Sequence, residues 1–132
     1  MDGYRLIPIQ PRDDGRGLVC LLDGLLPFSI ENMHIVDMRP GSVRGNHVHH
    51  RQREAMYISG GAFRLRLRDL EKDETQDVVH DSSAPVFVAI DPGCAHAVEN
   101  IGKETIKLVC LADRPFDPTN PDTIAVPLIA IG

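Results

Sequence analysis

Short apolar runs separated by Gly, Pro, Asp and Asn recur along the chain, and their length is typical of strands. The clearest alternation lies in residues 63–68, where Phe63, Leu65 and Leu67 alternate with arginines, so one face is apolar and the other charged. The pattern predicts roughly eight to ten strands and no helix. The expected strands are 18–22, 29–38, 46–49, 54–59, 62–68, 76–79, 86–90, 96–100, 106–112 and 124–130.

Strands of this length, joined by turns such as Gly60-Gly61, indicate an all-β fold. We expect an antiparallel jelly roll, in which two sheets pack face to face around one core. The first ten or so residues are expected to be irregular. The same holds for residues 113–122, because prolines at three positions exclude a central strand.

The length of 132 residues is enough for one hydrophobic core and too little for two. A single domain over residues 1–132 is therefore predicted. It would carry an N-terminal arm at about 1–16 and a C-terminal extension at about 113–132.

Charge and composition argue against several classes of partner. The formal net charge is -5, and the 14 basic residues form no dense block, which disfavours a nucleic-acid binder. The longest apolar runs have strand length, so no membrane span is expected. Three unpaired cysteines (Cys20, Cys94 and Cys110) and the lack of a leader-like N-terminus favour the cytoplasm.

Potential metal ligands are concentrated in two segments. His47 and His49 are two residues apart, so on a strand both side chains leave the same face. A turn over residues 50–53 would let Glu54 return a carboxylate toward them, and His96 would be added by folding. Any one of these histidines alone is better explained as a surface residue. The four together predict one divalent ion per chain, and Zn, Fe, Mn, Ni or Co fits such ligands.

The spacing of these residues resembles the two sequence motifs of the cupin superfamily. Every position of the first motif is present, as Gly41, His47, His49, Glu54 and Gly61. The second motif is matched by Gly93, His96 and Asn100. It departs from the pattern in two positions, since its leading glycine is missing and Pro92 abuts Gly93. Both departures affect a turn and leave the ligands intact.

Longer segments are similar to cupins that act on nucleotide-linked 4-keto sugars. Residues 14–28 and 43–47 resemble the opening of dTDP-sugar 3,4-ketoisomerases, and Arg44-Gly45-x-His47 also resembles dTDP-4-dehydrorhamnose 3,5-epimerase. Residues 44–123 resemble the cupin domain of bifunctional UDP-sugar epimerase/reductases of capsular polysaccharide synthesis. The ketoisomerases generally work without a metal, so the capsular zinc cupin is the nearer relative and zinc the favoured ion.

The resemblance implies C3 epimerisation or keto isomerisation of a 4-keto hexose through an enolate, in cell-surface polysaccharide synthesis. His50, next to the ligand pair, is a candidate base. Tyr57 is a candidate acid only if a bulge breaks its strand parity, and ordinary packing is the better interpretation. Arg44 is the candidate diphosphate contact, with a surface salt bridge as the alternative. Kinship also implies a homodimer.

Two other functions fit the same ligands. A set of histidines with a carboxylate can hold Fe(II) for a cupin dioxygenase or oxidase that acts on a small metabolite. A small cupin can also bind a metabolite without turnover. The sequence pattern does not separate these alternatives from the epimerase.

Overall fold

The computed structural model describes residues 1–81 and 84–131, and the described residues form strands and loops without a helix. The strands are β1 (Tyr4–Pro8), β2 (Arg12–Asp13), β3 (Leu18–Val19), β4 (Asn32–Met38), β5 (Val43–His49), β6 (Glu54–Ser59), β7 (Phe63–Asp69), β8 (Glu74–His80), β9 (Val86–Ile90), β10 (Cys94–Asn100), β11 (Ile106–Ala112) and β12 (Thr123–Ala125). This confirms the predicted all-β class.

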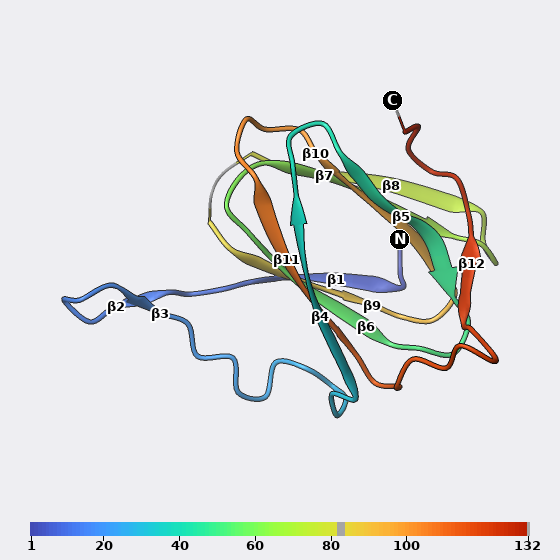
Figure 1. Cartoon of the computed structure of the whole chain (residues 1–132), viewed down its shortest axis with the longest axis horizontal. Coiled ribbons are helices and arrows are strands. Elements are labelled where there is room, and N and C mark those ends of the chain that lie inside the picture. Colours follow the sequence, from blue (N-terminus) through green and yellow to red (C-terminus); the bar gives the residue numbers. More distant parts are fainter. Residues whose placement is uncertain (82–83, 132) are drawn as a thin grey trace.

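Two antiparallel five-stranded sheets face each other (Figure 1). One sheet has the order β1-β9-β6-β11-β4, and the other has the order β12-β5-β10-β7-β8. Neighbours in each sheet are mostly distant in sequence, as in the predicted jelly roll. The two short strands β2 and β3 form a separate hairpin on an arm that extends away from the barrel (Figure 1).

Alternating residues from both sheets fill the core between them. On β7, Phe63, Leu65 and Leu67 are fully buried, as the alternation predicted. On the facing sheet, Met56 and Ile58 of β6 point into the same core. The residue parity of β6 therefore also places Glu54 on the inner face.

A second apolar cluster covers the outer face of the sheet that contains β6. Its buried residues include Ala55, Phe87 and Leu111, and residues of the segment after the hairpin, among them Leu25 and Phe28, pack against it. The N-terminal segment therefore shields a face that would otherwise be exposed. The opposite face of the same sheet lines the interior of the barrel.

Some strand boundaries differ from the sequence prediction. The first ten residues were expected to be irregular, but Tyr4–Pro8 pairs with β9 as an edge strand. Its single proline stands at the end of the strand, where a missing N–H costs little. The strand expected over 124–130 is limited to Thr123–Ala125. No described helix is long and apolar enough to cross a bilayer.

Candidate metal centre and adjoining pocket

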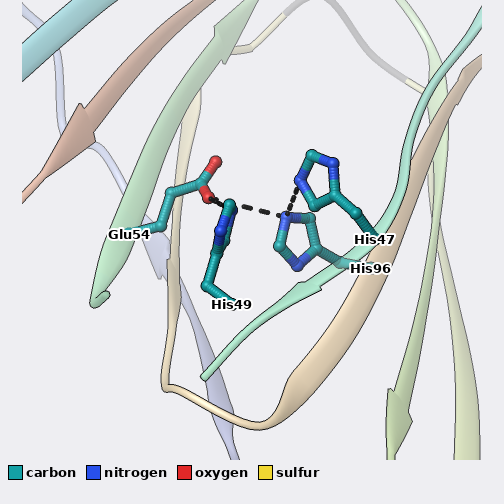
Figure 2. Close-up of side chains that lie close together, drawn as sticks. All are labelled: His47, His49, Glu54 and His96. Atoms are coloured by element: carbon teal, nitrogen blue, oxygen red, sulfur yellow. Dashed lines mark hydrogen bonds and ion pairs between the residues drawn. The ribbon is translucent and has the colours of Figure 1, made fainter. Parts of the chain in front are cut away.

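Four side chains from three strands converge inside one end of the barrel (Figure 2). His47 and His49 project from β5, Glu54 from the start of β6 and His96 from β10. The Nε2 atoms of His47 and His96 are 3.1 Å apart. Glu54 Oε2 lies 2.8 Å from His49 Nε2 and 3.6 Å from His96 Nε2.

The donor atoms fit a divalent transition metal. Ligand atoms about 2.1 Å from one ion lie about 3.0–3.4 Å from each other in tetrahedral or octahedral geometry. The three measured pairs span 2.8–3.6 Å, and all four donor atoms lie within 4.8 Å of one another. Three imidazoles and one carboxylate are ligands that suit Zn, Fe, Mn, Ni or Co.

Hydrogen bonds at the outer ring nitrogens orient two of the histidines. His96 Nδ1 lies 3.2 Å from the carbonyl oxygen of Cys94. A carbonyl oxygen can only accept, so Nδ1 carries the proton and the Nε2 lone pair faces the cluster. His49 Nδ1 lies 3.2 Å from the hydroxyl of Thr123 on β12. Such contacts fix the rotamer and tautomer of a histidine that binds a metal.

The charge states expected in the metal-free protein suit cation binding. Burial, with the neighbouring His96 and His49, lowers the pKa of His47 to about 4. Burial also lowers the pKa of His96. Burial opposes ionisation of Glu54, but the hydrogen bond from His49 and the nearby imidazoles outweigh it and lower the Glu54 pKa to about 2. Two neutral rings and a carboxylate therefore face one point.

The pKa of His49 moves in the opposite direction. Its burial acts to lower the pKa, but the hydrogen bond to Glu54 and the charges of Glu54 and Asp122 raise it above the ordinary value. The His49–Glu54 contact is thus an ion pair whenever His49 is protonated. A metal ion would replace the proton that these two side chains share.

The backbone of β5 allows the close approach of β10 at this site. Gly45 has φ of +91°, and a Cβ there would lie 2.7 Å from the carbonyl oxygen of His96. The register between the two strands shifts immediately after the His47–His96 pair. A side chain at position 45 would therefore push apart the strands that carry these two ligands.

The C-terminal segment holds β5 on both sides of the ligands. Asn46 has φ of +56°, and its side chain accepts hydrogen bonds from the Leu128 and Ile129 amides at 2.9 Å. Beyond His49, the Asp122 carboxylate accepts hydrogen bonds from the backbone N–H groups of residues 50–52. The turn that brings Glu54 back to the cluster is thus fixed by a residue distant in sequence.

A cavity of about 350 Å³ opens beside the cluster. Its lining combines three of the candidate ligands with apolar residues and two polar groups from β4 and β5. The residues are His34, Val36, Arg44, Gly45, His47, Glu54, Met56, His96, Val98, Leu108 and Cys110. The candidate metal centre therefore has an adjoining space for a small molecule.

Three residues singled out from the sequence have different locations. Arg44 lines this cavity and is exposed, with no ion pair among the described residues. His50 is exposed and lines a separate surface hollow with Asp69 and Leu70. Tyr57 lies in the outer apolar cluster, where its ring packs edge-on against Phe87 at 5.6 Å. The structure thus brings Arg44 to the cluster, but neither His50 nor Tyr57.

Sequence reasoning missed His34, which lines the cavity from β4. Strand parity contains the signal that would have found it, since His34, Val36 and the buried Met38 share one face of β4. Its distance from the histidine motif in the sequence obscured this.

Comparison with known proteins defines the family. Residues 14–124 match the family described as polysaccharide biosynthesis C-terminal domain. The chain belongs to this family. It is also 29% identical over 86 residues to UDP-2-acetamido-2,6-beta-L-arabino-hexul-4-ose reductase from Pseudomonas aeruginosa strain PA103. That match covers 65% of the chain but 23% of the relative, so the polysaccharide biosynthesis domain described here spans about a quarter of the reductase.

Solved structures confirm the cupin fold of this polysaccharide biosynthesis domain. The 3,4-ketoisomerase QdtA from Thermoanaerobacterium thermosaccharolyticum, a mutant in complex with TDP-4-keto-6-deoxyglucose, gives a TM-score of 0.76 at 20% identity, covering 94% of this chain and 88% of QdtA. The TDP-quinovose 3,4-ketoisomerase WlaRB from Campylobacter jejuni gives 0.78 at 18% identity, covering 94% and 93%. At such identities the likeness shows the fold alone.

A third structure is more similar in sequence. The capsular polysaccharide assembling protein CapF from Staphylococcus aureus is 26% identical with a TM-score of 0.69. The match covers 92% of this chain and 35% of CapF. The resemblance to cupins of nucleotide-sugar and capsular polysaccharide proteins, expected from the motifs, is confirmed.

Proposed function

We propose that this chain is a metal-dependent cupin that acts on a nucleotide-linked 4-keto hexose in cell-surface polysaccharide synthesis. The reaction is C3 epimerisation or keto isomerisation through an enolate. The observation that carries the proposal is the convergence of His47, His49, Glu54 and His96 on one point. Three of these four side chains, those of His47, Glu54 and His96, line a cavity of about 350 Å³. Family membership and the named relatives supply the substrate class.

Removal of a proton next to a ketone requires stabilisation of the negative charge that develops on the ketone oxygen. A zinc ion held by the four ligands would supply this stabilisation when bound, by polarising that oxygen. The protein itself would give the site its shape and exclude water from it. Met56, Val98 and Leu108 form apolar walls, and such walls exclude water and strengthen electrostatic interactions in the cavity.

Arg44 is proposed to bind the diphosphate of the substrate. Its guanidinium lies at the cavity that contains the candidate ligands, and it makes no ion pair with a described residue. A guanidinium can contact phosphate oxygens with two parallel hydrogen bonds, which a lysine ammonium does not reproduce. The sugar would then extend from the diphosphate toward the histidine cluster.

The test uses zinc-loaded protein with UDP- or TDP-4-keto-6-deoxyglucose in deuterated water. We expect deuterium at C3 after epimerisation and at C4 after keto isomerisation, and in both cases NMR shows loss of the C3 proton signal. Protein treated with a chelator is the matched control and should lose the exchange. Absence of exchange with both nucleotides and with Zn, Fe or Mn would reject the proposal. Oxygen consumption restored by Fe(II) would favour the oxygenase instead.

A further inference from the structure

His34 faces the cavity across from the histidine cluster. It lies on β4, whose register pairs it with Cys110 of β11, and Cys110 in turn pairs with Met56 of β6. These three residues form a row across one sheet, and all three line the cavity. His47 and His96 belong to strands of the opposite sheet. A substrate in the cavity would therefore lie between His34 and these two candidate ligands.

The other titratable groups of the cavity are poorly suited to move protons. The rings of His47 and His96 and the carboxylate of Glu54 would be engaged as metal ligands. The guanidinium of Arg44 has five N–H donors and no acceptor atom that could take a proton from carbon. Burial, with the nearby Glu54 charge, raises the pKa of the Cys110 thiol to about 12.

His34 is free of such constraints. It is exposed, and no hydrogen bond or ion pair to another described residue involves its ring. Imidazole is the side chain that most often serves as a general acid or base in enzymes. An exposed ring can also exchange its proton with solvent between catalytic events. Among the described residues that line the cavity, His34 thus combines an unoccupied nitrogen with access to water.

We propose that His34 is a catalytic acid–base residue of this site, an inference that rests on the proposed function. Its neutral imidazole takes the proton from C3 of the 4-keto sugar. The electron pair of the broken C3–H bond forms the C3–C4 double bond, and the ketone oxygen becomes the enolate oxygen. In keto isomerisation the imidazolium delivers a proton to C4, while the C3 hydroxyl gives its proton to solvent and becomes the ketone. In epimerisation water delivers a proton to the opposite face of C3, and the imidazolium gives its own proton to solvent. No oxidant or second reactant is required.

The experiment compares His34→Gln with Asp37→Asn. Asp37 lies on the same strand, on its outward side, and pairs with Lys107 at 2.7 Å away from the cavity. The assay is loss of the C3 proton of UDP- or TDP-4-keto-6-deoxyglucose in deuterated water, with kcat and KM measured separately. We expect His34→Gln to lower kcat about 100-fold with KM changed less than about threefold, as for loss of a general base. Asp37→Asn should keep the wild-type rate.

Zinc content and the thermal unfolding midpoint of each variant separate a chemical from a structural effect. His34→Gln should bind one zinc per chain and unfold like the wild type. His34→Asn, which introduces a shorter amide side chain, should show the same loss of kcat. If wild type and His34→Gln exchange at equal rates, this inference is wrong and the proposed function survives. If zinc-loaded wild type exchanges no deuterium, both are wrong.

Discussion

The four candidate ligands differ in their protonation before a cation binds. His47 and His96 have lowered pKa values, whereas His49 shares a proton with Glu54 across 2.8 Å. One side of the cluster is therefore neutral and the other is an internal ion pair. This division follows from position, because Glu54 contacts His49 more closely than His96.

Substitution of one inner ligand should remove metal binding. We expect His49→Ala to lose stoichiometric zinc because three of the four donors remain and Glu54 loses its partner. His50→Ala is the matched control, since the adjacent imidazole lies outside the cluster. Zinc is measured by elemental analysis after dialysis against a weak chelator. Full zinc content in His49→Ala would remove this residue from the ligand set.

The hydroxyl of Thr123 should tune the affinity for the metal. When His49 is neutral, its Nε2 donates to Glu54 and its Nδ1 can accept from the Thr123 hydroxyl; when His49 is protonated, its Nδ1 donates to the hydroxyl oxygen. When a metal takes Nε2, Nδ1 holds the proton and the same hydroxyl can accept it. Thr123→Val keeps the side-chain shape but loses both hydrogen bonds.

We therefore expect Thr123→Val to weaken zinc binding about 10-fold, the lower end of effects seen for outer partners of metal ligands. Thr123→Ser should bind zinc like the wild type, since the hydroxyl is retained. Competition with a fluorescent chelator measures both affinities. Equal weakening in the Val and Ser variants would indicate a packing effect and contradict the assigned hydrogen bond.

At the scale of elements, the C-terminal segment determines where the ligand strand lies. The short strand β12 pairs with β5 through Thr123↔His49 and Ala125↔His47, so it lies directly beside the two candidate ligands of β5. The Asp122 carboxylate precedes this pairing and binds the turn after β5. Segment 120–129 thus supports the candidate metal site, although it contributes no candidate ligand.

Loss of the Asp122 charge should destabilise the protein in a pH-dependent way. Burial acts to raise the Asp122 pKa, but hydrogen bonds from Arg51, Gln52 and His50 outweigh it, so the folded-state pKa lies below the ordinary 3.8. A depressed carboxyl pKa stabilises the fold above the unfolded-state pKa, and this contribution disappears as pH falls through the folded-state value.

We expect Asp122→Asn to lower the free energy of unfolding by about 1–2 kcal/mol at pH 7. The difference from wild type should be full at pH 7 and smaller at pH 3. Urea denaturation at both pH values measures it. Asp117→Asn is the control, because that carboxylate bonds only within its own loop. An equal deficit at pH 7 and pH 3 would contradict an electrostatic origin.

Sequence reasoning predicted the elements whose information is local. The alternation of Phe63, Leu65 and Leu67 identified an inner face, and the spacing of His47 and His49 placed both rings on one side of a strand. It did not predict contacts between segments that are distant in the sequence. The clamp of Asp122 on residues 50–52 joins parts of the chain that no periodicity relates. Strand parity puts His34 on the inner face of β4, but only the sheet order brings that strand to the cavity.

At the scale of the whole molecule, an apolar surface remains on the described chain outside the barrel core. Met33 and Ile35 on the outer side of edge strand β4 are 64% and 60% exposed. Leu21, two residues after β3, is 70% exposed. Large exposed side chains beside an unpaired strand edge are typical of a surface that another chain covers. The homodimer expected from kinship therefore stays a prediction, with β4 as its candidate contact.

A homodimer through β4 makes a definite prediction about mass. Light scattering coupled to gel filtration should give two copies of the 14.6 kDa chain. The double variant Met33→Ser and Ile35→Ser should shift the mass toward one copy, because a β4 contact would lose its largest apolar side chains. Val79→Ser is the matched control. Val79 is 57% exposed on β8, the edge strand of the other sheet, and its loss should leave the dimer intact.

A wild-type monomer at 100 µM would contradict the dimer. Dissociation by Val79→Ser alone would show that the contact lies on the opposite sheet and not on β4.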